Sequence, residues 1–213
     1  AEFIATGLML TGIIIALFQA DTNVAGPAVS DARIWTFGTG GTLKLAEGAV
    51  EVFAEGYIQR GVAGELLNGD TIRAKGNAYT LGVQYNYVPV WVGVSFTSFS
   101  GERDEDPTDT TANRFAGYES LNDLLVMEDS YYGFDWDSNY QALKLWLGAR
   151  VSTARKDDLE LMAILGVLEA TERVFTQGGA DTNDELGYEI DFRIRWHLNK
   201  QALLHASLGL LFG

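Results

Sequence analysis

The chain has no cysteine and only 2 histidines among its 213 residues. It therefore has no thiols for a disulfide framework, no thiolates for a metal site and too few histidines for a His-rich metal centre. The chain has fewer basic than acidic residues, 15 against 29. The resulting formal net charge of −14 argues against nucleic acid or an anionic membrane surface as a partner.

The chain also lacks a recognisable catalytic pattern. It contains no Ser-His-Asp order, no phosphate-binding loop and no metal motif. Glu189 and Asp191 are consistent with an acid–base pair for glycoside hydrolysis. They lie two residues apart on one expected strand, however, which favours an ion-pair ladder with Arg193 and Arg195. We predict that the protein is not an enzyme and uses no cofactor.

Apolar and polar residues alternate along much of the chain. In LGYEIDFRIRWHL (186–198), apolar and charged residues take every second position, which predicts a strand with one apolar and one charged face. Only 3 prolines and as many as 24 glycines fit a chain with many strands and turns. We predict a single all-β domain over 1–213. Its nine expected strands lie near 3–20, 32–43, 49–60, 72–85, 90–100, 139–151, 158–170, 186–198 and 202–212.

The apolar run 3–18 is the one segment for which a membrane helix is an alternative. It is shorter than the ~20 residues that a membrane-spanning helix needs. Glu2 is its only nearby charge, so the basic start of a signal peptide is missing. The β-branched residues 13–15 favour a strand.

The connections between these strands alternate in length. Those at 44–48, 86–89, 152–158 and 199–201 are short, and those at 21–31, 61–71, 101–138 and 171–185 are long. Outer-membrane barrels alternate tight periplasmic turns with long extracellular loops in this way. We therefore predict an antiparallel up-and-down transmembrane β-barrel in the bacterial outer membrane, with 101–138 as a long acidic extracellular loop.

In such a barrel the apolar strand faces meet lipid and the charged faces line a pore. The expected pore-lining residues are Glu51, Glu55, Lys144, Arg150, Glu189, Asp191, Arg193, Arg195 and His197. Strand 186–198 follows a long loop, so its acids come nearest the outer mouth and its arginines lie deeper. This profile favours outward passage of an anionic polymer.

The aromatic residues and the long loop leave alternatives open. Inward rings would stack on sugars, whereas outward rings would form an interfacial girdle; the residues concerned are Trp35, Tyr79, Tyr85, Trp91, Trp146, Tyr188 and Trp196. Segment 118–129 has helical spacing and either folds into the pore as a plug or packs on the barrel rim. Asp104, Asp106 and Asp109 form a candidate Ca²⁺ loop, with a solvated surface loop as the alternative.

Three stretches carry a resemblance to a known family. NAYTLGVQYNYVPVWVGVSFTSFSGERDEDPTD (77–109), FDWDSNYQALKLWLGARVSTARKDDLELMAIL (134–165) and DELGYEIDFRIRWHLNKQALLHASLGLLFG (184–213) are similar to the porin-like alginate-export family of bacterial outer-membrane β-barrels. The resemblance implies a wide barrel that passes a secreted polyanion through a constriction of arginine and lysine. Here acids share that face, so the resemblance supports the barrel more firmly than alginate.

The predicted function is an outer-membrane channel that passes or exports a polar solute, for which an anionic polysaccharide such as alginate is the candidate. The expected partners are outer-membrane lipid, lipopolysaccharide, the polymer, and periplasmic or surface proteins, but no nucleic acid. A structural barrel that scaffolds a partner assembly and a soluble β-sandwich binding module are the alternatives. Nine strands are an odd number for a bacterial barrel, so we expect this chain to be part of a larger one.

Overall fold

The computed structural model describes residues 5–18, 33–65, 69–101, 111–115, 124–128, 138–152, 158–175, 182–197 and 202–213. These residues form strands and one short 3-10 turn, η1 (Ala46–Gly48). The strands are β1 (Ala5–Phe18), β2 (Arg33–Leu45), β3 (Val50–Glu65), β4 (Thr71–Ala74), β5 (Asn77–Tyr87), β6 (Val90–Phe99), β7 (Thr111–Ala112), β8 (Tyr140–Ser152), β9 (Asp158–Phe175), β10 (Thr182–His197) and β11 (Leu203–Phe212). In the described part of the chain, no helix is long and apolar enough to cross a membrane.

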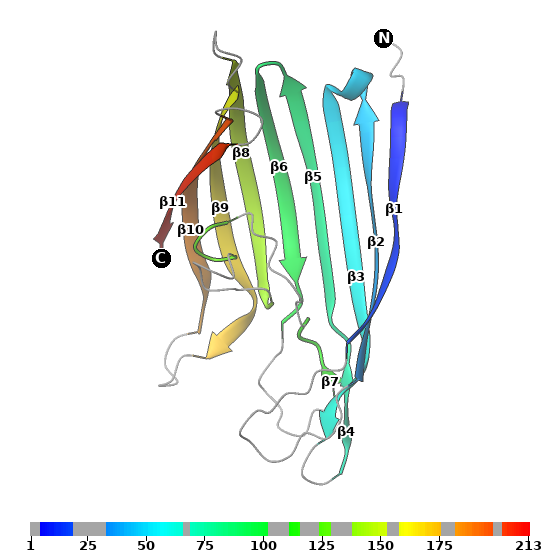
Figure 1. Ribbon diagram of the computed structural model, residues 1–213. Helices are drawn as coiled ribbons and strands as arrows, with labels where there is room; N and C mark the ends of the chain where they lie inside the picture. The colour runs from blue at the N-terminus through cyan, green and yellow to red at the C-terminus, as the bar shows by residue number, and fades with distance from the viewer. Residues whose placement is uncertain are drawn as a thin grey trace.

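Nine of the strands form one sheet in chain order, β1-β2-β3-β5-β6-β8-β9-β10-β11, and every neighbouring pair is antiparallel. The sheet curls into a half-barrel, which Figure 1 views from its concave side. Among the described strands, the edges β1 and β11 each pair with one neighbour only. The all-β antiparallel meander is therefore as predicted, and β1 confirms a strand within the apolar run 3–18.

Two details of the strand prediction are wrong. The strand expected at 72–85 is broken at 75–76 into β4 and β5, and β4 pairs with the far end of β3 and with the short β7. The loop expected at 171–185 is mostly strand, because β9 and β10 stay paired as far as Phe175 and Thr182. These strand ends pair through their backbone groups. The sequence there has no sustained alternation of apolar and polar residues, so the pattern did not indicate a strand.

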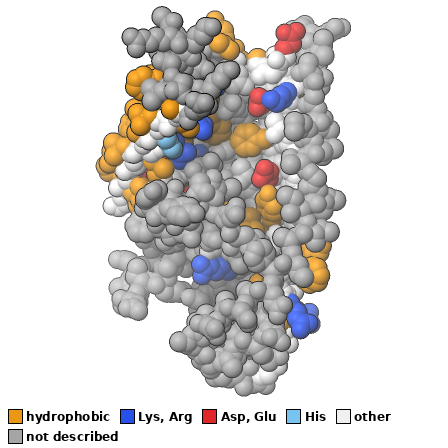
Figure 2. All heavy atoms as spheres, in the orientation of Figure 1, with side chains coloured by type: hydrophobic (Ala, Val, Ile, Leu, Met, Phe, Trp, Pro, Cys, Tyr) orange, Lys and Arg blue, Asp and Glu red, His pale blue; other side chains and the backbone are white. Residues whose placement is uncertain are grey.

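The two faces of the sheet differ in chemistry as the alternation predicts. The convex face exposes large apolar side chains along β2, β3, β5, β6, β8, β9, β10 and β11, among them Phe37, Val52, Leu81, Val92, Leu145, Leu165, Phe192 and Leu208. The concave face carries buried polar groups, including Thr36, Gln59, Thr97, Lys144, Glu189 and Asp191. Figure 2 shows the concave side, where acidic and basic side chains lie in the hollow beside apolar ones.

Aromatic rings cover glycines on the concave face. A Cβ atom placed on Gly93 would lie 2.2 Å from the Trp146 ring, and one on Gly148 would lie 2.1 Å from the Trp91 ring. Phe53 covers Gly82 in the same way. Glycine in a strand often marks such a close approach. These rings therefore pack directly on the backbone of the neighbouring strand.

Candidate functional site

The most elaborate side-chain arrangement lies where residues 124–128, here called the docked segment, rest on the concave face. The segment belongs to the long connection between β6 and β8 and lies in front of β9 and β10 (Figure 1, green). It forms a turn with one helical hydrogen bond, from Glu128 N–H to the Leu124 carbonyl at 3.2 Å. Within 118–129, where the spacing predicted a short helix, the described residues 124–128 form a turn. This turn lies on the concave face, the side on which a plug was expected; whether it plugs a pore stays a prediction.

Two carboxylates of β10 hold the backbone of the docked segment. Asp191 Oδ2 accepts the Leu125 N–H at 2.9 Å. Glu189 accepts two amides, that of Val126 through Oε1 at 2.6 Å and that of Met127 through Oε2 at 3.0 Å. Hydrogen bonds to an ionised acceptor are about twice as strong as neutral ones. Three consecutive amides are therefore fixed by two fully buried acids.

The segment supplies a third acid, Glu128, to the wall of β8. Its Oε1 lies 2.6 Å from Lys144 Nζ and accepts the Tyr140 hydroxyl at 2.7 Å. Its Oε2 accepts the Leu124 N–H at 3.0 Å. The glutamate and lysine side chains are 0% and 1% exposed. Because desolvated charges are tolerated only when they are paired, this ion pair ties the docked position to one geometry.

Apolar contacts also hold the docked segment on the concave face. Leu124 and Met127 are buried in a cluster with Ile164 and Leu168 of β9. This contact explains why β9 breaks the alternation with apolar residues on its inner face. Gly166 leaves room beneath the segment, since a Cβ atom there would lie 2.8 Å from Leu124 Cδ1.

Gly209 of β11 leaves similar room on the other side of the segment. A Cβ atom there would lie 2.8 Å from Asp191 Oδ1 and 3.0 Å from both Leu125 Cβ and Val126 Cγ2. Because Gly166 and Gly209 have no side chain, the docked segment approaches the sheet closely at both positions.

The remaining predicted pore-lining residues also lie on the concave side, and the basic ones there have acidic neighbours. Arg193 lies 3.7 Å from Asp191, and Arg195 lies 3.9 Å from Glu160. Arg150 donates its Nε–H to the same Glu160 at 3.0 Å.

On the opposite side of the half-barrel, Glu51 pairs with Lys44 at 3.1 Å. Glu55 accepts the Tyr57 hydroxyl at 3.2 Å, and His197 is exposed. The concave face therefore presents mixed rather than uniformly positive charge.

Three residues of this site did not appear among the sequence candidates. Glu160 follows from the alternation of β9, where it opposes Leu159 and Leu161. Tyr140 begins β8 on its inner face, beside the candidate Lys144. Glu128 has no such signal. It lies in a loop, and the helical spacing of 118–129 does not specify where on the sheet that loop docks.

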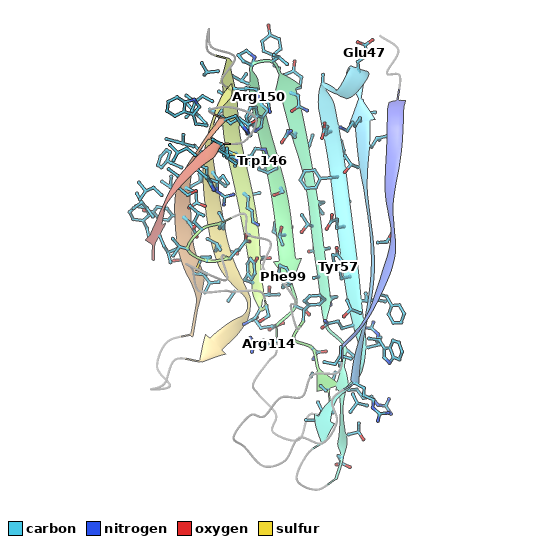
Figure 3. The ribbon with its side chains drawn as sticks, viewed as in Figure 1. Glu47, Tyr57, Phe99, Arg114, Trp146 and Arg150 are labelled. Atoms are coloured by element: carbon cyan, nitrogen blue, oxygen red, sulfur yellow. The ribbon has the colours of Figure 1, made fainter. Side chains whose placement is uncertain are left out.

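The aromatic residues divide between the two faces. Trp91 and Trp146 are on the concave side, and the Trp146 indole donates to Gln84 Oε1 at 2.9 Å. Figure 3 marks Tyr57 near the long-loop end and Trp146 nearer the short-turn end. On the convex side are Trp35, Tyr79, Tyr85, Tyr188 and Trp196, each exposed.

The candidate Ca²⁺ residues Asp104, Asp106 and Asp109 lie outside the described residues. Among the residues that are described, no group of three His, Asp or Glu is placed to hold a metal ion. No protein-family model matches the chain, and no curated protein matches its sequence. The resemblance to the alginate-export family and the substrate it implies therefore stay a hypothesis.

Proposed function

We propose that this chain forms the wall of a β-barrel channel in a bacterial outer membrane, which passes a polar solute along the concave face. The observation that carries this proposal is the inversion of the two faces. Apolar side chains such as Leu145 and Phe192 are about half exposed on the convex side, whereas Lys144, Glu189 and Asp191 are buried on the concave side. A water-soluble fold places these groups the other way round.

The extent of the apolar surface supports lipid as its solvent. Soluble monomers rarely expose a contiguous apolar patch of more than a few hundred Å². Here exposed apolar residues continue across neighbouring strands, as in Leu81, Val92, Leu147 and Leu161. Hydrocarbon would cover this surface without a second protein layer, which a soluble β-sandwich would require.

The aromatic residues at the strand ends give a second support. Tyr79 and Tyr85 of β5 are both exposed on the convex face, and so are Tyr188 and Trp196 of β10. At about 3.4 Å per residue, the two pairs span roughly 20 and 27 Å along their strands. Transmembrane barrels have an apolar band about 25 Å tall between two aromatic girdles, which agrees with this spacing.

The concave face suits a polar solute. Its ion pairs, its hydroxyls and its inward Trp91 and Trp146 offer hydrogen bonds and ring faces to a hydrated molecule. Because the basic side chains there have acidic neighbours, the described wall does not by itself select anions. The anionic polysaccharide suggested by the resemblance is one candidate solute.

Site-directed fluorescence tests the assignment of the two faces. The chain has no cysteine, so single-cysteine variants accept one label each. A label at Val83→Cys on the convex face should be quenched by spin-labelled lipid in vesicles, and one at Thr80→Cys on the concave face should not. Equal quenching at both positions, together with solubility without detergent, would contradict the membrane proposal.

Planar-bilayer recording then separates a channel from a scaffold. A channel should give discrete conductance steps that depend on salt concentration. Insertion into vesicles with no conductance under any condition would favour the structural barrel instead.

A further inference from the structure

We propose that the docked segment is a releasable closure of the concave face, and that protonation of Glu189 and Asp191 releases it. This inference concerns regulation and rests on the proposed channel function. The docked segment covers the inner side of β8 to β11 while remaining part of a connection rather than of the sheet. Within the described residues 124–128, no residue takes part in a strand pairing that release would break.

The hydrogen bonds to Glu189 fit only the ionised carboxylate. Both of its oxygens accept a backbone N–H, from Val126 and from Met127. A protonated carboxyl group has one O–H donor, which would point at an N–H donor instead of accepting it. One proton therefore removes a charge-assisted bond and also places two donors against each other.

Asp191 adds to the same effect. It accepts the Leu125 N–H and lies 3.7 Å from Arg193, so a proton on it weakens both interactions. Glu189 and Asp191 are neighbours on the same face of β10 and together accept three consecutive amides, so protons on the two acids weaken adjacent contacts of the same segment.

Among the described residues, the charged or titratable groups around these acids are Arg193 from β10, Lys144 and Tyr140 from β8, and Glu128 from the docked segment. β9 and β11 face the pair with uncharged residues, Gly166 opposite Glu189 and Gly209 opposite Asp191. His205 of β11 is opposite Arg195, further along the strand.

Release would also change the charge of the wall. Glu128 leaves with the docked segment, whereas Lys144 stays on β8. Protonation of Asp191 at the same time removes the carboxylate charge beside Arg193. The opened face is therefore more positive than the closed one, and the open channel should prefer anions.

The accessibility of a single cysteine at Met127 measures release directly. Met127 is 4% exposed in the docked position, so Met127→Cys should react slowly with a maleimide at pH 7.5. Acidification from that pH should raise its reactivity relative to that of Thr42→Cys in the same buffers. Thr42 lies on β2, away from the docked segment, and it corrects for the pH dependence of the thiol reaction itself.

Two variants reproduce release at neutral pH. Glu189→Gln places an amide donor against one of the two backbone N–H groups that Glu189 accepts, and Asp191→Asn removes the charge on the acceptor of the Leu125 N–H. Met127→Cys in this double variant should react quickly at pH 7.5. Gly166→Leu fills the hollow beneath the segment, where a Cβ atom meets only Leu124, and it changes no charge. Met127→Cys in this background should react quickly at both neutral and acid pH. Glu55→Gln, on the same face but away from the segment, is the matched control, and Met127→Cys in this background should react as Met127→Cys alone does.

Unchanged reactivity in the double variant and on acidification would overturn the inference. Conductance distinguishes this outcome from failure of the channel proposal. If reactivity switches but no current flows at either pH, the closure stands and the channel function fails. If current flows and neither current nor reactivity depends on pH, the channel stands and the closure fails.

Discussion

Replacing Lys144 by Met should loosen the docked segment, because it leaves the Glu128 carboxylate buried against an alkyl chain. The two side chains are 1% and 0% exposed, and Nζ lies 2.6 Å from Oε1. Removing one partner of a buried ion pair costs about 3–5 kcal/mol, since an uncompensated charge stays behind. The Tyr140 hydroxyl and the Leu124 amide still donate to Glu128, so we expect the lower end, about 3 kcal/mol.

This loss should appear as local undocking rather than as unfolding of the sheet, because a loop opens more easily than paired strands. Hydrogen exchange at the amides of Leu125, Val126 and Met127 is the assay, since each must leave its carboxylate before it exchanges. A cost of about 3 kcal/mol corresponds to roughly 150-fold faster exchange. Amides in the centre of β5 should not change.

A second substitution tests the reasoning behind this number. Lys144→Met combined with Glu128→Gln removes both charges of this pair, so neither position carries an unpaired buried ion. Replacing a buried ion pair by neutral groups is often close to neutral, so exchange should return to within about tenfold of the unmodified protein. If the double variant exchanges as fast as Lys144→Met or faster, the buried-charge argument is refuted.

Three further changes probe other parts of the structure. Gly166→Val should also accelerate exchange in the docked segment by displacing Leu124, whereas Gly56→Ala, which meets no atom within 4 Å, should change nothing. Phe192→Arg on the convex face should lower the free energy of unfolding in vesicles by about 2–4 kcal/mol if that face meets lipid near the midplane, and a negligible loss would count against the membrane proposal. Trp146→Phe should cost about 0.5–1.5 kcal/mol in urea titrations, because the ring still covers its glycine and one indole hydrogen bond is lost; a loss above 3 kcal/mol would mean that the indole has a larger role.

The strands and their two faces could be predicted from the sequence alone. A strand sends successive side chains to opposite sides, so the alternation in 186–198 assigns Phe192 and Glu189 to different faces without any tertiary contact. The lengths of most connections likewise indicate an antiparallel meander. Prediction was poorest where strands run past the apolar region, as at Phe175 and Thr182, because paired backbone leaves no side-chain pattern there.

The candidate site depended on the tertiary structure. Alternation placed Glu189, Asp191 and Lys144 on one face, but it gave no sign of what they bind. Their partners are backbone amides and a glutamate in a loop, and the amides lie more than sixty positions away from their acids in the chain. A backbone N–H is present at every residue except proline, so the sequence does not show which amide a carboxylate will bind. Only the folding of the connection onto the curled sheet brings these donors and acceptors together.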